Sequence, residues 1–330
     1  MTQDVVVGNP PRRERRWKRA VKWALALGVV AFVAWEVWSR LTLADFRDVR
    51  FSWETWGWLA ASTLALPGMY ACIALSERML LESVTDRRLT LAELIPAAWV
   101  PLAGKYVPGK VAAAGAAVVL LKRLGIPATT ALGVFVLLDA MPVLVGTVLG
   151  SALLLEDRVR EAFPAAAGVF VAVFAGGIVC LTPSVFRQLT TIALRLMRRP
   201  PLPRTPRWRD YVGPVLCSVG QWCFNGLSVW LAMRAFQPEL RLVWLPWTAC
   251  ATALTMCLSY FAAFVTPSGI GLREGAFIAL LSPVVGLPAA TATAVAMRLN
   301  HTIVEAALCG VGLLVLKGGR RKEEGGSPET

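Results

Sequence analysis

Six blocks of about twenty apolar residues recur along this chain, and they constrain its fold more than any other feature. A helix needs about 20 apolar residues to cross the hydrocarbon core of a bilayer, which is about 30 Å thick. The blocks lie at about 23–38, 55–76, 128–155, 164–183, 211–236 and 289–316. Because membrane-spanning backbone must satisfy its own hydrogen bonds, the sequence predicts an all-α fold, a polytopic transmembrane helix bundle with six full spans.

The composition argues against a soluble enzyme and against a metal centre. Hydrophobic residues make up 56% of the chain and charged residues 17%. Soluble domains have about 45–50% apolar residues and about 25% charged ones. The seven cysteines lie in or beside apolar blocks, without the spacing of zinc ligands, and there is one histidine. No HExxH or Walker lysine motif occurs. We therefore expect neither a metal nor a cofactor, and we expect that the chain is not an enzyme.

Two further apolar regions are interrupted by proline and glycine. Region 91–121 contains the break Lys105-Tyr106-Val107-Pro108-Gly109-Lys110, and region 244–285 contains Thr266-Pro267-Ser268-Gly269-Ile270-Gly271-Leu272-Arg273-Glu274. Proline removes a helical hydrogen bond, and a broken helix at membrane depth is tolerated where it lines a cavity. We interpret both regions as re-entrant helical hairpins. The alternative, in which both cross twice, gives eight or more helices and leaves the termini on the same side.

Positive charge indicates the orientation, because short cytoplasmic loops are rich in Lys and Arg. With the N-terminus inside, the inner segments are 1–22, 77–90, 122–127, 184–210 and 317–330, and they hold 23 of the 34 Lys and Arg residues. We therefore expect a multi-pass protein of the cell membrane, inner or plasma, with both termini cytoplasmic. Its parts are a basic segment at 1–22, one transmembrane domain at 23–316 and a disordered tail at 317–330.

The transmembrane domain contains an internal repeat. Gly125-Ile126-Pro127-Ala128-Thr129-Thr130-Ala131 returns as Gly286-Leu287-Pro288-Ala289-Ala290-Thr291-Ala292, and the same offset of 161 pairs Asp139 with Asn300. The halves, about 55–155 and 211–316, each read as span, hairpin, turn, span. With hairpins that open to opposite sides this is an inverted repeat, the arrangement with which many transporters form a site at mid-membrane.

The two breaks supply the candidate substrate-binding residues, because a charge near the bilayer centre is costly and normally lines a cavity or pairs. The candidates are Lys105, Pro108, Gly109, Lys110, Pro267, Gly269, Gly271, Arg273 and Glu274. Arginine offers a planar fork to a phosphate, and glycines let a headgroup approach the backbone. The structural alternatives are that Arg273 and Glu274 pair and close the hairpin, and that the two lysines only anchor it at the interface.

A polar stripe on the last span is a second candidate cluster. Arg298, His301 and Glu305 follow an i, i+3, i+7 spacing and share one helical face. His301 is a candidate proton relay, although a single histidine in a helix is more often structural. Together with Asp139 and Asn300 these residues form a candidate polar network, in which we expect Asp139 to neutralise Arg298 or Arg273.

At the two breaks, the sequence resembles the transmembrane region of the lysylphosphatidylglycerol synthase family, flippase-like membrane proteins. The resemblance rests on Lys105–Lys110, Leu120–Pro127 and Pro267–Gly275, and covers roughly residues 20–316 in order of features. It implies a protein that moves or handles lipid between leaflets, which in bifunctional members is aminoacylated phosphatidylglycerol. Those members carry a cytosolic aminoacyl-transferase domain after the membrane region. No such domain follows within these 330 residues, so we expect that this chain does not make the modified lipid. Ser268-Gly269 stands where the family often has Gly-Gly.

Three functions compete. The leading one is a lipid translocase whose substrate is an anionic phospholipid, an aminoacylated lipid or a polyprenyl-phosphate-linked lipid. The second is a non-transporting subunit or scaffold of a lipid- or glycan-modifying enzyme, docked through 184–210. The third is a membrane transferase, which needs a general base, and among the deep carboxylates (Glu93, Asp139, Glu274 and Glu305) none forms a DxD-like pair. The basic segments favour anionic lipid headgroups over nucleic acid as their partner.

Overall fold

The structure is a computed structural model that describes residues 52–85, 87–106, 111–157, 161, 165–196, 207–262 and 271–324. All regular elements within these ranges are helices, as expected from the sequence. The basic segment 1–22 and the first apolar block, 23–38, lie outside the described residues.

Two long helices, α2 (Trp53–Val84) and α9 (Trp208–Phe236), form the centre of the bundle. They run antiparallel, since Ser62 meets Ser228 and Gly68 meets Phe224 further along. A Cβ atom at Gly68 would lie 2.7 Å from the Phe224 ring, so the absence of a side chain there permits the close approach. Around this pair, buried leucines, methionines and alanines from α5, α10, α11 and α12 complete the core.

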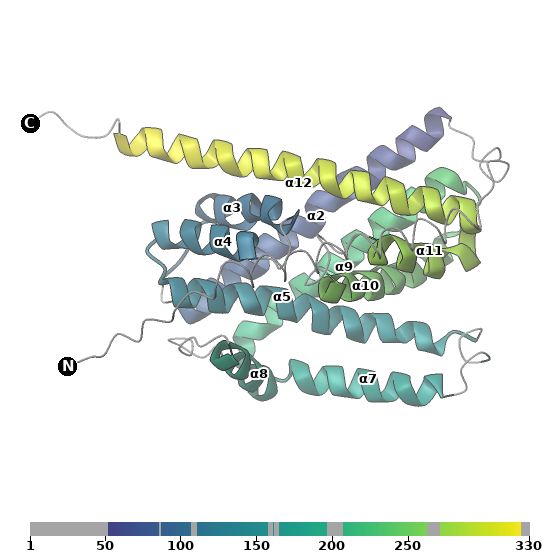
Figure 1. Ribbon diagram of the computed structural model, residues 1–330, viewed down its shortest axis with the longest axis horizontal. Helices are drawn as coiled ribbons and strands as arrows, with labels where there is room; N and C mark the ends of the chain where they lie inside the picture. The colour runs from purple at the N-terminus through teal and green to yellow at the C-terminus, as the bar shows by residue number, and fades with distance from the viewer. Residues whose placement is uncertain are drawn as a thin grey trace, which may run out of the picture.

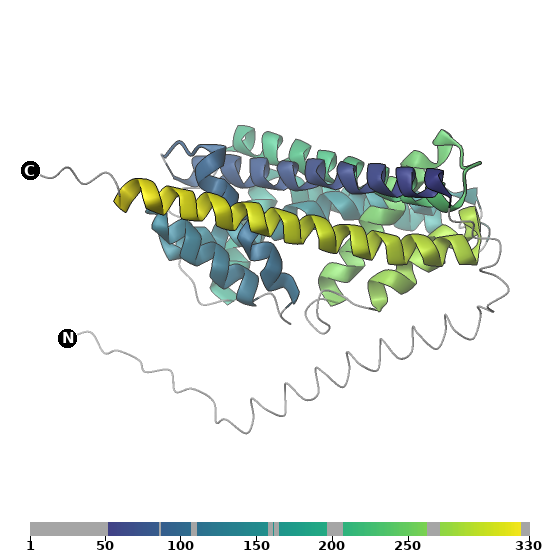
Figure 2. The ribbon, with the colours of Figure 1, turned by 90° about the horizontal axis from the view of Figure 1, so that it is seen from above.

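The two interrupted regions form pairs of shorter helices at opposite ends of the bundle (Figure 1, Figure 2). The first pair is α3 (Leu91–Trp99), continued by the 3-10 helix η1 (Val100–Tyr106), and α4 (Val111–Arg123). The second is α10 (Leu245–Ala262) and α11 (Leu272–Val285). In both pairs the helix ends that flank the break point toward the middle of the long helices (Figure 2). The residues of the breaks themselves, 107–110 and 263–270, lie outside the described residues.

Each pair is followed by the same turn and a long helix. Gly125 and Gly286 have φ of 77° and 78°, and each stands two residues before a proline. Glycine adopts this left-handed region readily because it has no Cβ atom. The helices that follow are α5 (Ala128–Ser151) and α12 (Leu287–Glu324). Helix α5 packs on α10, α12 packs on α3 and η1, and both also touch α2 and α9.

The remaining described elements lie at the periphery. Helix α7 (Ala166–Leu181) packs along α5, and α8 (Pro183–Leu196) follows it at an angle (Figure 1). The short 3-10 helices η2 (Ala152–Leu155) and η3 (Leu242–Trp244) extend α5 and precede α10.

Five helical stretches of the described chain are long and apolar enough to cross a membrane: Trp53–Val84, Ala128–Leu155, Trp208–Phe236, Leu242–Tyr260 and Leu287–Gly318. Four of them match predicted spans. The predicted span 164–183 appears as α7, which has 16 residues. A helix of that length reaches about 24 Å, at about 1.5 Å per residue. Helix α10, predicted as one arm of a hairpin, is long enough to cross by itself, whereas α11 is not.

Two helices run past their predicted ends. The sequence ends the second span at about 76 and assigns 77–90 to the inner side of the membrane, whereas α2 continues to Val84. The charges there are compatible with a helix, since Arg78 Nε lies 3.0 Å from Glu82 Oε1 one turn later. Leu80 and Leu81 are fully buried, so the helix also has an apolar face at this level. Helix α12 likewise continues to Glu324, within the segment 317–330 predicted as a disordered tail.

Candidate functional site

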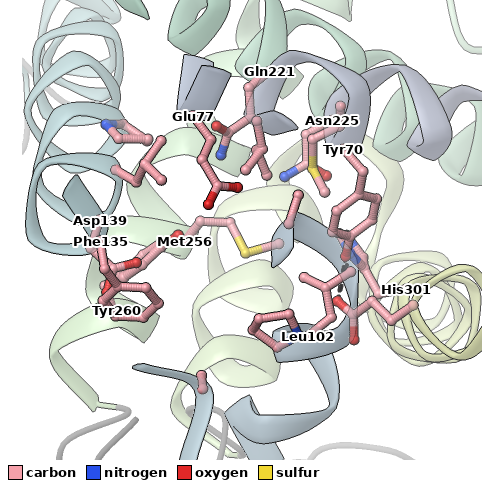
Figure 3. Close-up of a pocket in the computed structure, with 18 of the residues that line it drawn as sticks. Tyr70, Glu77, Leu102, Phe135, Asp139, Gln221, Asn225, Met256, Tyr260 and His301 are labelled. Atoms are coloured by element: carbon pink, nitrogen blue, oxygen red, sulfur yellow. Dashed lines mark hydrogen bonds and ion pairs between the residues drawn. The ribbon is translucent and has the colours of Figure 1, made fainter. Parts of the chain in front are cut away.

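A cavity of about 240 Å³ lies inside the bundle, where the two broken helix pairs meet the long helices. Its lining comes from α2, α3, η1, α4, α5, α9, α10, α11 and α12, so both halves of the chain contribute. The volume is much larger than one water molecule needs. Four aromatic side chains, Tyr70, Phe135, Trp222 and Tyr260, share the wall with polar groups. Figure 3 labels Tyr70, Phe135 and Tyr260 among them.

Arg273 is the one arginine among the described residues that line the cavity. It is the second residue of α11 and is 5% exposed, with its guanidinium carbon 5.8 Å from the centre of the Phe277 ring. Its Nη2 is buried and makes no hydrogen bond within the described structure. A buried guanidinium with a free donor, at a helix N-terminus whose dipole also favours anions, is suited to bind an anionic group.

Tyr70, His301 and Glu305 form a hydrogen-bonded cluster on one wall of the cavity. Figure 3 labels Tyr70 and His301. The Tyr70 hydroxyl donates to Glu305 Oε1 and lies 3.5 Å from His301 Nδ1, which is 4.0 Å from the same Glu305 oxygen. All three residues are buried. Glu305 is also within electrostatic reach of Arg273. The stripe predicted on the last span therefore reaches the cavity through His301 and Glu305, which are held in place by Tyr70.

Two other carboxylates line the cavity. Asp139 lies beside Tyr260 on the wall opposite His301 (Figure 3). Glu77 extends from α2 into the space between them (Figure 3), is 5% exposed, and has no hydrogen bond or ion pair among the described residues. Three carboxylates thus face one arginine in the described lining.

Glu274 and Arg298 belong to the scaffold beside the cavity. Gly271, with φ of 90°, precedes α11, and its N–H donates to Glu274 Oε2 at 2.8 Å. The other Glu274 oxygen lies 3.7 Å from Arg298 Nη1. The counter-charge of Arg298 is therefore Glu274, where the sequence suggested Asp139. Neither residue lines the cavity, and their contacts fix the start of α11 and so the position of Arg273.

Asn300 lies in a different polar group, which we call the seam: Ser62, Ser228 and Asn300. Each serine hydroxyl donates to the backbone oxygen of the other serine at 2.8 Å, and the two hydroxyls are 3.0 Å apart. Asn300 Nδ2 donates to Ser62 Oγ at 3.1 Å. The seam joins α2, α9 and α12, and its three residues are at most 7% exposed. The expected five-residue polar network is therefore divided over three places.

The remaining predicted site residues fall at the breaks. Lys105 is the penultimate residue of η1. Pro108, Gly109, Lys110, Pro267 and Gly269 lie outside the described residues. Their role in substrate binding stays a prediction.

Sequence reasoning missed Glu77, Gln221 and Asn225, all of which are buried and line the cavity. Glu77 falls at the start of the segment 77–90, which the sequence assigns to the inner side of the membrane. Gln221 and Asn225 are one turn apart on α9, so they share a face, and this pair of amides within an apolar span was a signal that could have marked them. Glu93, in contrast, is exposed rather than deep, and it caps α3 through Thr90.

The described chain holds no group of three or more His, Cys, Asp or Glu side chains placed to bind a metal ion. The chemistry of the cavity is instead that of a polar binding site with an arginine, three carboxylates and two amides.

The chain matches a known protein family over most of its length. The family described as Lysylphosphatidylglycerol synthase TM region matches residues 21–309, well over half of the chain. A search of curated proteins finds no match. The chain therefore belongs to this membrane family, as its breaks indicated, and it is a multi-pass membrane protein connected with lipids.

Proposed function

We propose that this member of the family is a lipid translocase, and that the cavity receives the polar headgroup while the acyl chains stay in the surrounding lipid. The observation that carries the proposal is Arg273, a buried arginine with an unused donor facing a cavity inside a membrane protein. A charge in that position is costly unless it acts on a ligand or a partner. The phosphate common to membrane lipids is the group that fits it.

The ends of the broken helices support the same proposal. Helix α4 begins at Val111 and α11 at Leu272, and both N-termini point toward the middle of the bundle (Figure 2). Helix N-termini at a break attract anions, and transporters use them for anionic parts of a substrate. We place the phosphate at Arg273 and the start of α11, and Lys105 and Lys110 at the opposite break as further contacts.

Alternating access is the mechanism that we propose for headgroup movement. The two helix pairs would act as re-entrant hairpins that open in turn to opposite leaflets, as an inverted repeat allows. The seam supports this symmetry, because Ser62 and Ser228 make reciprocal hydrogen bonds, as residues on a two-fold axis do. Ser62 and Ser228 are 166 residues apart, so the same two-fold operation relates Gly68 to Arg234 and Phe224 to Trp58. The Gly68–Phe224 contact should then have a counterpart between Arg234 and Trp58. Arg234 does stack on Trp58, 4.7 Å from the ring centre.

The three carboxylates bear on the choice of substrate. A headgroup with only negative charge would be repelled by Glu77, Asp139 and Glu305 unless some of them carry protons. An aminoacylated lipid offers an ammonium group to the same carboxylates. We therefore rank the aminoacylated lipid above the anionic phospholipid and the polyprenyl phosphate.

The test is headgroup translocation by purified protein in liposomes. The reporters are an anionic phospholipid, lysyl-phosphatidylglycerol and a polyprenyl phosphate, and the variants are wild type, Arg273→Ala and Arg234→Ala. Arg234 is the matched control, because it lies on α9 away from the cavity. We expect wild type and Arg234→Ala to move at least one reporter and Arg273→Ala to move it at least tenfold more slowly. If folded wild-type protein moves none of them, the scaffold function replaces this proposal.

A further inference from the structure

We infer that Glu77 carries a proton in the resting protein and exchanges it during transport, so that headgroup movement is coupled to proton movement. The inference rests on the proposed translocase function, and it names the source of energy for the same cavity. Glu77 lies in the long helix α2, is 5% exposed and faces the cavity.

The first observation is that Glu77 differs from the other two carboxylates of the cavity. Glu305 accepts a hydrogen bond from Tyr70 and lies near Arg273. Asp139 lies beside Tyr260. Glu77 has no such neighbour among the described residues. An isolated buried carboxylate costs less free energy when it binds a proton than when it remains charged.

The second observation is the charge of the whole lining. The titratable and charged groups that face the cavity with Glu77 come from α2, α5, α10, α11 and α12, and they are Tyr70, Asp139, Tyr260, Arg273, His301 and Glu305. Helix α9 contributes the neutral Gln221 and Asn225, and the described linings of α3 and α4 are apolar. On η1, Lys105 is the titratable residue, and its side chain is not described. If all three carboxylates were ionised, the described lining would carry three negative charges. Arg273 and a protonated His301 would supply two positive charges, so one negative charge would remain unbalanced.

The third observation separates a proton from a metal cation. Hard cations such as Ca²⁺ and Mg²⁺ take six or more oxygen ligands, including waters. Among the described residues, the carboxylates of the cavity do not come together in a group of three or more His, Cys, Asp or Glu side chains that could hold a metal ion. A proton needs one carboxylate oxygen, which Glu77 provides.

The proposed step is a simple proton exchange. A hydronium ion on one side of the membrane gives its proton to a Glu77 oxygen, which forms the O–H bond, leaves a water molecule and neutralises this carboxyl group beside the phosphate of the entering headgroup. When the cavity opens to the other side, the proton passes to water there and the carboxylate returns. The net result is one proton moved in the same direction as one lipid headgroup.

The test compares wild type with Glu77→Gln, Glu77→Asp and Glu82→Gln in liposomes, with and without a pH difference of about one unit. Glu82 is the control on the same helix, since it pairs with Arg78 and accepts from the Leu89 N–H, outside the cavity. We expect wild type, Glu77→Asp and Glu82→Gln to move the reporter several-fold faster down the proton gradient. Glu77→Gln should show one rate in both conditions.

A second measurement does not depend on transport. Infrared spectroscopy of the purified protein at neutral pH should show a protonated carboxylic acid band that disappears in Glu77→Gln and remains in Glu82→Gln. A wild-type rate that ignores the proton gradient, a gradient response that survives in Glu77→Gln, or the absence of that band would each overturn the inference. Loss of transport in Arg273→Ala tests the translocase itself, so the two failures are distinguishable.

Discussion

The seam and the cavity are two buried polar regions of the same bundle, and they differ in how far the hydrogen bonds of their polar groups are satisfied. In the seam, Ser62 and Ser228 bond to each other across α2 and α9, and Asn300 adds a third helix. In the cavity, Glu77 has no partner within the described chain, and Arg273 Nη2 and Asn225 Oδ1 make no hydrogen bond there. Buried polar groups are normally satisfied, so the unsatisfied groups that line the cavity are available to a ligand or a proton.

Polar residues of a membrane protein are therefore best sorted by their partners. Satisfied groups of the seam hold helices together, where each interhelical hydrogen bond contributes about 0.6 kcal/mol and up to about 2 kcal/mol. Unsatisfied groups of the cavity cost free energy in the empty state. Changes in the seam should therefore lower stability, and changes at the unsatisfied groups of the cavity should lower transport without lowering stability.

The largest effect should follow Ser62→Leu. Ser62 is fully buried between α2 and α9, so a leucine there overfills the contact and breaks its hydrogen bonds to Ser228. We expect a loss of about 3 kcal/mol of stability, from overpacking and lost bonding together. Thermal unfolding in detergent measures it, with the smaller Ser62→Ala as control. Equal stability of Ser62→Leu and wild type would show that the seam does not stabilise the contact between α2 and α9.

The next effect is that of Arg273→Met, which keeps most of the length of the side chain and removes its charge. Transport should fall at least tenfold, which corresponds to about 1.4 kcal/mol. The unfolding temperature should stay the same or rise, because a buried guanidinium with an unused donor is removed. Headgroup translocation and thermal unfolding are measured on the same preparation. A clear drop in unfolding temperature would assign Arg273 a structural role.

A matched pair of asparagines gives a smaller and sharper contrast. Asn300→Leu removes the hydrogen bond to Ser62 and should cost about 1 kcal/mol. Asn225→Leu removes a buried amide oxygen without a hydrogen bond and should be neutral or stabilising. Unfolding curves of both variants test this. Transport should be slowed by Asn225→Leu and kept by Asn300→Leu once the folded fractions are matched, and the reverse order would contradict the assignment of the two regions.

The smallest effect concerns the end of the α2–α9 contact. Arg234 lies over Trp58 at 4.7 Å and over Trp230 at 5.4 Å from the ring centres. Trp58→Leu keeps an apolar side chain and removes one of these stacking contacts, so it should cost about 0.5–1 kcal/mol. Thermal unfolding of Trp58→Leu, with Trp53→Leu at a highly exposed position as control, measures it. Equal curves for the two variants would show that the stacking adds nothing.

The positions of four spans could be predicted from the sequence because an apolar block of about 20 residues forms a helix that crosses the bilayer. The two Gly-x-Pro turns were also readable, since glycine before such a turn indicates the positive φ that Gly125 and Gly286 adopt. The stripe on α12 was found for a similar reason, since polar residues at helical spacing must share a face.

Partners between helices could not be predicted. Ser76-Glu77-Arg78 has the composition of a loop, and only the packing of α9 and α5 around α2 makes Glu77 a cavity residue. The sequence favours a substrate-binding role for Glu274, but its contacts are to the Gly271 N–H and to Arg298, 24 residues away in sequence. Spacing along one chain segment carries no information about such contacts.

Helix α12 has a practical consequence for imaging. It has 38 residues, and its apolar part ends at Gly318. A helix of that length spans about 57 Å, against a hydrocarbon core of about 30 Å. The helix also continues past the other elements (Figure 1). A second helical protein fused in phase with its last turn would be held rigidly outside the micelle, as an alignment marker for single-particle microscopy of the bundle.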